Sequence, residues 1–175
     1  MLQFFKNIFM NRKYQLGYSD SKPSMYKEDE RIKKANKTVA ILKDYLNEIS
    51  TLDLLDIGSY PGGWSQVVSK IVTSGKIMSI DLKKMDPINK VKFVKADFLE
   101  VKTKYEISDY FKKNLDVILS DMAANTTGSK SLDSIRTNQL CADVINFSRN
   151  ILKPKGVLVA KLFMGEDFEE VKNLA

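Results

Sequence analysis

The segment 52–66 constrains the fold of this chain more than any other. Residues 52–57 are mostly apolar and predict a buried strand of a parallel sheet. A turn with Gly58, Pro61 and Gly62 follows, and apolar residues then recur at helical spacing. A strand, a glycine-rich turn and a helix in this order form the unit with which an α/β protein holds a nucleotide-like cofactor. The turn lacks the pattern G-x-G-x-x-G, so it is not the fingerprint of a dinucleotide site.

Strand patterns alternate with helix patterns along the rest of the chain. The strands are expected at 52–57, 76–80, 91–94, 115–120 and 157–163, and the helices at 28–49, 63–73, 104–113, 133–152 and from near Glu166. This alternation predicts an α/β fold, with a doubly wound, Rossmann-like and mostly parallel sheet between helices. The last strand would be an exposed apolar edge unless a partner or a missing segment covers it.

Composition divides the chain into two parts. Residues 1–30 are polar and basic and predict a loosely ordered N-terminal arm, whereas residues 31–175 predict a single Rossmann-like domain that is truncated at its C-terminus. The first 13 residues carry no acid, which is typical of a short amphipathic arm or, alternatively, of an organellar targeting segment. No apolar run approaches the roughly 20 residues of a membrane span. We therefore expect a cytoplasmic protein with no membrane partner.

The amino-acid content excludes several kinds of chemistry. The chain has no histidine, which removes the commonest general base, the Ser-His-Asp triad and the commonest metal ligand. The single cysteine, Cys141, excludes an internal disulfide and a cysteine-rich zinc site, and we expect no metal. The net charge of +6 suits a polyanionic partner without specifying one. Any proton transfer therefore falls to Lys, Asp, Glu or Tyr.

Four polar residues follow or interrupt the expected strands near their carboxyl ends. They are Asp81, Asp97, Asp121 and Lys161. In an open α/β sheet these ends form the ligand crevice. Asp81 lies about 20 positions after Gly62, where an acid can accept hydrogen bonds from ribose hydroxyls. Asp97 is placed to meet an adenine amino group.

Each of these residues also has a purely structural interpretation. Asp81 and Asp97 can begin or cap a turn. Asp121 ends an apolar run, where an acid is costly unless it faces a polar crevice. Lys161 interrupts the apolar strand VLVAKLF, and lysine is seldom buried, although on an edge strand it can act as a gatekeeper against aggregation. Trp64 can be a core aromatic or a cofactor contact. We favour a functional role for the three aspartates and the lysine.

Taken together, these stretches resemble the FtsJ/RrmJ-type RNA ribose 2′-O-methyltransferases, which use S-adenosylmethionine. The matching stretches are DIGSYPGGWSQ, IDLKKMDPI, KADF, VILSDMAANTTG and AKLFMGEDFEE, which lie within residues 52–170 in the family's order. The resemblance implies a class I methyltransferase fold and a catalytic tetrad of lysine, aspartate, lysine and glutamate. It also implies cofactor contacts at Gly62, Trp64, Asp81, Asp97 and Asp121.

The resemblance places the tetrad only in part. Its central lysine falls on Lys161 and its aspartate on Asp121. The first lysine falls on Lys37 by ungapped extension, or on Lys27 if about ten residues are inserted. The glutamate has no counterpart, because the family continues past Ala175 through another helix and an antiparallel strand pair that carries it. This departure puts the activity of the 175-residue chain in doubt.

The expected reaction is methylation of a ribose 2′-hydroxyl in RNA. Lys161, crowded by apolar residues and by Lys37, would accept the hydroxyl proton, and Asp121 would orient it. We expect a monomer that acts on large-subunit ribosomal RNA or on a ribosomal subunit, with its basic arm on the phosphates. Alternatives are transfer RNA or an mRNA cap as substrate, an impaired remnant that binds S-adenosylmethionine and RNA, and a nucleotide-dependent oxidoreductase.

Overall fold

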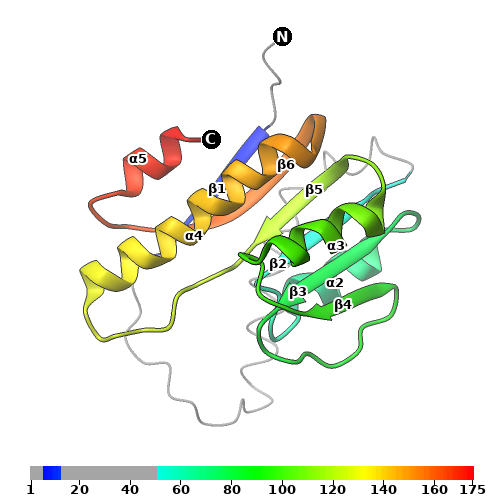
Figure 1. Cartoon of the computed structure of the whole chain (residues 1–175), viewed down its shortest axis with the longest axis horizontal. Coiled ribbons are helices and arrows are strands. Elements are labelled where there is room, and N and C mark those ends of the chain that lie inside the picture. Colours follow the sequence, from blue (N-terminus) through cyan, green and yellow to red (C-terminus); the bar gives the residue numbers. More distant parts are fainter. Residues whose placement is uncertain (1–5, 13–50) are drawn as a thin grey trace.

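The computed structural model describes residues 6–12 and 51–175, which form a six-stranded sheet with helices on both faces (Figure 1). The strands are β1 Lys6–Arg12, β2 Leu54–Ile57, β3 Ile77–Asp81, β4 Val91–Lys95, β5 Leu115–Ser120 and β6 Leu152–Phe163. The helices are α2 Gly63–Ile71, α3 Val101–Phe111, α4 Lys130–Ile151 and α5 Phe168–Asn173. All strand pairs are parallel, in the order β1-β6-β5-β2-β3-β4. The prediction of an α/β fold with a parallel sheet is confirmed.

The sheet carries one apolar cluster on each face. Leu54 packs with Trp64 and Val68 of α2 on one face, while Leu55 packs with helices α3 and α4 on the other. Figure 1 shows α3 and α4 in front of the sheet and α2 behind it. Successive side chains of a strand point to opposite faces, so a strand covered on both sides needs a continuous apolar run. That requirement explains why the buried positions of β2, β5 and residues 156–160 of β6 are mostly apolar.

Strand β1 changes the expected edge of the sheet. It pairs in parallel with β6, from Lys6 opposite Val157 to Arg12 opposite Phe163. The expectation of an exposed apolar edge at 157–163 is therefore wrong, and part of the segment expected to be a loosely ordered arm is a strand. The physical reason is that an unpaired apolar edge leaves a row of unsatisfied N–H and C=O groups, which the sequence KNIFMNR satisfies.

Three elements begin at least three residues before the sequence-based expectation, and one of them is helix α4, which begins at Lys130 rather than at 133. Helix α3 begins at Val101 rather than at 104. Strand β6 begins at Leu152, directly after α4, rather than at 157. Its register with β5 jumps from the pair Leu115–Leu152 to the pair Val117–Val157. The expected turn at 153–156 is thus present as an irregularity within a longer strand.

The predicted helix at 28–49 lies outside the described residues. Among the helices of the described part, none combines the length and the apolar character needed to cross a membrane.

A charged network closes the amino-terminal end of the sheet between β2 and β5. Asp116 accepts a hydrogen bond from the Asp53 backbone N–H (2.9 Å) and pairs with Lys153 (2.7 Å). Asp53 accepts from the Lys76 backbone N–H (3.1 Å) and pairs with Lys113 (2.7 Å), which raises the pKa of that lysine. Both carboxylates are buried, whereas the two paired lysines reach the surface. The network therefore satisfies backbone groups where the chain enters the sheet.

Another buried carboxyl group, that of Asp56, lies in the middle of β2 beneath α2. Ser65 donates a hydrogen bond to its Oδ2 (2.5 Å), and the Ser65 and Ser79 hydroxyls are 2.6 Å apart. Asp56 Oδ1 has no hydrogen-bond partner among the described residues. Burial raises the pKa of Asp56 to about 7, against the lowering effect of the Ser65 hydrogen bond. The group is therefore protonated in the folded protein at pH values where it ionises in the unfolded chain.

We predict that Asp116→Ala destabilises the protein by about 2 kcal/mol, because it leaves the buried Asp53 backbone N–H without its acceptor. Chemical denaturation measures the loss, and Asp109→Ala, at an exposed position of α3, is the matched control. Equal stability of the two variants would contradict this account of the network.

We predict that the contribution of Asp56 to the free energy of unfolding falls as the pH rises from 3.8 to about 7. In this window the unfolded chain releases the Asp56 proton and the folded chain retains it, so ionisation favours unfolding, by at most about 1.4 kcal/mol per pH unit. Asp56→Asn should remove this contribution in denaturant titrations at several pH values, and Asp109→Asn should keep it. An Asp56→Asn variant with the wild-type slope would rule out this carboxyl as the source.

Candidate functional site

The loops that follow β2 and β5 meet at the carboxyl end of the sheet. The Asp121 backbone N–H donates to the Ile57 carbonyl (3.1 Å). Gly58 has a φ of 73°, and a Cβ at this position would lie 2.7 Å from the Met122 backbone nitrogen. A side chain at position 58 would thus be strained and would also push the two loops apart. This close approach brings the glycine-rich turn next to the residues that follow β5.

Asp121 and Lys161 form an ion pair at this edge. The last register pair of β5 and β6 is Ser120–Ala160, so the next residue of each chain segment stands opposite the other. Alternation along β6 places Lys161 on the face that α2 covers, after Val157 and Val159. The lysine side chain is 12% exposed and the aspartate side chain 35%. The structure therefore brings together Lys161 and Asp121, two of the three residues that the sequence suggested for catalysis.

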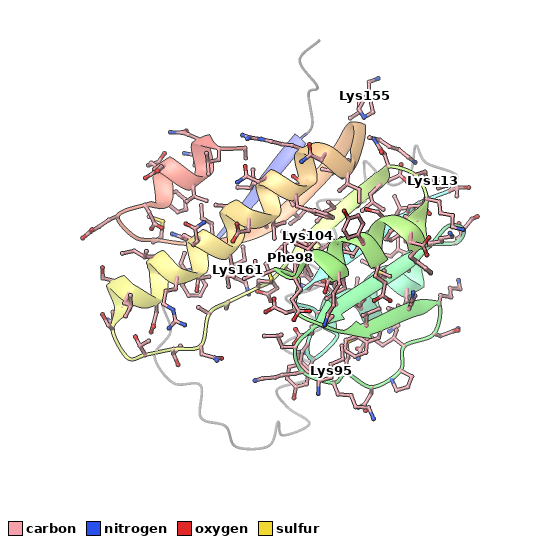
Figure 2. The ribbon with its side chains drawn as sticks, in the orientation of Figure 1. Lys95, Phe98, Lys104, Lys113, Lys155 and Lys161 are labelled. Carbon is pink, nitrogen blue, oxygen red and sulfur yellow. The ribbon has the colours of Figure 1, made fainter. Side chains whose placement is uncertain are left out.

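Lysines of the described residues lie at both ends of the sheet. Figure 2 shows Lys161 on the side where the strands end, and Lys113 and Lys155 on the opposite side. Of these three lysines, only Lys161 lies beside the loops at the carboxyl ends of the strands, where an open α/β sheet binds its ligands.

Asp81 is held at the end of β3 by two backbone groups. Its Oδ2 accepts from the Tyr60 N–H (2.9 Å) and its Oδ1 from the Lys83 N–H (2.8 Å). The carboxylate is thus fixed in orientation beside the glycine-rich turn, with lone pairs left on both oxygens to accept hydrogen bonds. Such a fixed acceptor suits a pair of neighbouring hydroxyl groups.

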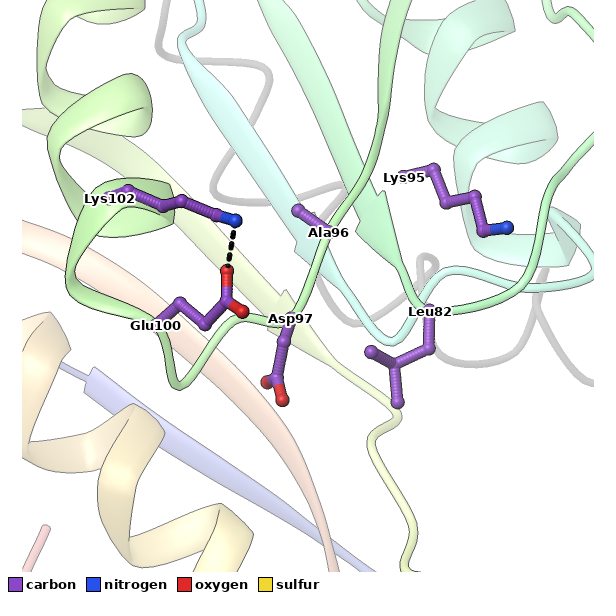
Figure 3. A pocket seen from close by; sticks show the side chains of 6 residues that line it. All are labelled: Leu82, Lys95, Ala96, Asp97, Glu100 and Lys102. Carbon is purple, nitrogen blue, oxygen red and sulfur yellow. Dashed lines mark ion pairs between the residues drawn. The ribbon is translucent and has the colours of Figure 1, made fainter.

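A pocket of about 400 Å³ lies beyond the ends of β3 and β4 (Figure 3). It is lined by Leu82, Lys95, Ala96, Asp97, Glu100 and Lys102. Asp97 Oδ1 accepts from the Leu99 backbone N–H (2.9 Å), and an ion pair between Glu100 and Lys102 (2.9 Å) lies at the rim. The Asp97 and Leu82 side chains extend in the same direction in Figure 3. The pocket thus combines an apolar wall with a carboxylate acceptor.

Gly62 and Trp64 have packing roles in the structure. Gly62 has a φ of 106°, and a Cβ there would lie 2.8 Å from the Met85 sulfur. The space that its missing side chain leaves is therefore filled by the loop after β3. Trp64 is buried in the cluster that joins α2 to the sheet. Their contacts with a cofactor remain predictions.

The amino-terminal half of α4 carries a buried polar face that the sequence reasoning missed. Asp133 accepts hydrogen bonds from the Thr127 N–H and hydroxyl (both 2.7 Å), and Thr137 accepts from the Ala124 N–H (3.2 Å). These contacts fix the loop after β5, which begins with Asp121. The signal in the sequence was a set of polar residues at helical spacing, just before the apolar residues of the same helix face.

The remaining members of the expected tetrad are not placed. Lys37 and Lys27 lie outside the described residues, so the choice between them stays open. The glutamate stays without a counterpart among the residues that the sequence comprises. The catalytic and cofactor-binding roles of all these residues remain predictions.

Comparison with known proteins shows which proteins the chain is related to. A family model described as FtsJ-like methyltransferase matches residues 29–175. The ribosomal RNA large subunit methyltransferase E of Pelagibacter ubique is 38% identical over 141 residues, which are 81% of this chain and 70% of that protein. The protein of the same name from Rickettsia akari is 38% identical over 149 residues, which are 82% of this chain and 66% of that protein.

A solved structure shows the same fold. A Plasmodium falciparum protein described as a ribosomal RNA methyltransferase superimposes with a TM-score of 0.69 at 29% identity, and the match covers 79% of this chain and 81% of that one. The match of the family model to most of the sequence and the agreement in fold lead to one conclusion. The chain belongs to the FtsJ-like methyltransferase family.

Proposed function

We propose that this protein transfers a methyl group from S-adenosylmethionine to a ribose 2′-hydroxyl of RNA, most directly of large-subunit ribosomal RNA. The observation that carries the proposal is the Lys161–Asp121 ion pair, which lies at the carboxyl edge of the sheet beside the glycine-rich turn. Relatives named ribosomal RNA large subunit methyltransferase E support the choice of substrate. Transfer RNA and an mRNA cap are the alternatives within the same chemistry.

The residues at the strand ends fit S-adenosylmethionine. Asp81, fixed by two backbone N–H groups, would accept hydrogen bonds from the ribose hydroxyls. Asp97 and Leu82 would hold the adenine, through an acceptor for its amino group and an apolar wall. Asp121 would lie near the positive sulfur. When bound, the cofactor supplies an electrophilic methyl group.

Lys161 is the residue proposed to act on the RNA hydroxyl. A 2′-hydroxyl is a weak nucleophile while it keeps its proton. The neutral amine of Lys161 would accept that proton, and its ammonium form would stabilise the developing alkoxide by a charge-assisted hydrogen bond. Asp121 contacts the Lys161 ammonium and thereby fixes where it points. Holding the reacting groups in line supplies much of the remaining acceleration, roughly 7–11 kcal/mol in well-oriented systems.

The charge of the protein suits an RNA substrate. The sequence carries 28 Lys and Arg against 22 Asp and Glu, which favours contact with phosphates. Phosphate contacts do not read sequence, so target choice would depend on the shape of the RNA around an unstacked nucleotide. The second candidate function is binding of the cofactor and RNA without methyl transfer.

We predict that Lys161→Ala lowers the rate of methyl transfer to ribosomal RNA by roughly 10²- to 10⁴-fold, the usual contribution of a general acid–base group. Its affinity for S-adenosylmethionine should stay within about twofold of wild type, because the donor contacts are made by other residues. Single-turnover transfer of labelled methyl groups and calorimetric titration measure the two quantities.

Lys153→Ala is the matched control, since this lysine lies on the same strand and pairs with Asp116 at the other end of the sheet. Its transfer rate should resemble that of wild type. Wild-type turnover by Lys161→Ala would refute the role of this lysine. Cofactor binding without transfer by the wild-type protein on every RNA tested would favour the second candidate function.

We predict that Asp81→Ala weakens binding of S-adenosylmethionine by about 10- to 100-fold, as expected for the loss of hydrogen bonds to a charged acceptor. Calorimetric titration tests this, with Asp109→Ala as the control on the exposed face of α3. Unchanged cofactor affinity in Asp81→Ala would show that Asp81 does not bind the ribose of the cofactor.

A further inference from the structure

Strand β6 extends beyond its partner β5 at the end that carries Lys161. The pairing of β5 with β6 ends at Ser120–Ala160, whereas β6 continues to Phe163. On its other side β6 remains paired with β1 as far as Phe163. Alternate residues of a strand present their backbone groups to the same side. Beyond Ala160 the side that faces β5 therefore needs another partner.

Asn138 of α4 supplies that partner. Its Oδ1 accepts from the Phe163 N–H (2.8 Å), and its Nδ2 donates to the Phe163 carbonyl (2.9 Å). The second N–H of the same amide donates to Asp167 Oδ1 (2.8 Å). The side-chain amide thus pairs with both backbone groups of one residue, as a peptide group of a neighbouring strand would. Asn138 is fully buried, so these contacts are protected from water.

A second contact one turn earlier strengthens the attachment. Ser134 donates a hydrogen bond to the Met164 carbonyl (3.2 Å). A Cβ at Gly165 would lie 2.1 Å from the Ser134 hydroxyl oxygen, so the segment after β6 approaches α4 as closely as a glycine permits. From Phe163 onward, side chains of α4 therefore make the hydrogen bonds to β6 that β5 makes earlier in the strand.

A buried polar residue at position 138 needs a reason, because the same helix continues with apolar core residues such as Cys141 and Ile145. An apolar residue would leave the Phe163 N–H and C=O without these partners. Buried backbone groups without hydrogen bonds are rare because they lower the stability of the folded protein. The backbone that Asn138 holds is two residues from Lys161, in the part of β6 that extends beyond β5. A small displacement there moves the lysine relative to Asp121, and catalytic geometry tolerates only small displacements.

We infer that Asn138 is a positioning residue for Lys161. Its amide takes the place of β5 beside Phe163 and fixes the end of β6 on that side, which holds the lysine next to Asp121. The inference rests on the proposed function for its catalytic consequence, but its structural consequence can be measured independently. Neither Asn138 nor Phe163 touches the reacting groups in this account.

The experiment compares Asn138→Leu with Asn150→Leu. The first replacement has nearly the same shape and removes all three hydrogen bonds, and the second removes an exposed asparagine of the same helix. The first readout is the rate at which a small amine-acylating reagent modifies Lys161, located by mass spectrometry, with Lys153 as the internal reference. We expect Asn138→Leu to increase the Lys161 rate several-fold and to leave Lys153 unchanged, whereas Asn150→Leu changes neither.

The second readout separates binding from turnover. In Asn138→Leu we expect kcat for methyl transfer to fall at least about tenfold, with affinity for S-adenosylmethionine within about twofold of wild type. Should Asn138→Leu not fold, Ser134→Ala removes the weaker contact alone and should raise the Lys161 acylation rate to a smaller extent.

The outcomes distinguish the two proposals. A Lys161 acylation rate that is unchanged in both folded variants, Asn138→Leu and Ser134→Ala, would overturn the positioning role whatever the activity. Faster acylation of Lys161 in a protein whose wild type transfers no methyl group would support the positioning role and count against the proposed function.

Discussion

The parallel pairing of β5 with β6 is the constraint on which the candidate site depends. Its register places Asp121 opposite Lys161 one step past the last paired residues, on the face of the sheet that α2 covers. A shift of one residue would turn the lysine to the other face, into the apolar cluster beneath α4.

The same two strands carry a lysine–aspartate pair at each end of the sheet, and the pairs differ in what surrounds them. Asp116 and Lys153 lie at the amino-terminal end, where the carboxylate also satisfies a backbone N–H of β2. Asp121 and Lys161 lie at the opposite end, beside a glycine-rich turn and a fixed Asp81. Residue type alone therefore does not mark the candidate site, and position at the carboxyl ends of the strands does.

The sequence predicted the parts of the fold that depend on local pattern. The apolar runs located β2, β3, β4 and β5, and the residues at their ends located Asp81 and the Lys161–Asp121 pair. It did not predict β1, because pairing with a strand about 150 residues away leaves little local signal. It also missed the polar face of α4, since residues such as Asn138 are recognised as partners of Phe163 only when the two segments are placed together.

The central claim is that this site methylates a ribose hydroxyl. The most direct measurement is nucleoside mass spectrometry of large-subunit ribosomal RNA and ribosomal subunits after incubation with the protein and isotopically labelled S-adenosylmethionine. The account predicts a single labelled nucleoside whose label stays with the ribose when the base is released, and far less label in the same time with Lys161→Ala. Label on a base, or equal labelling by wild type and Lys161→Ala, would contradict it.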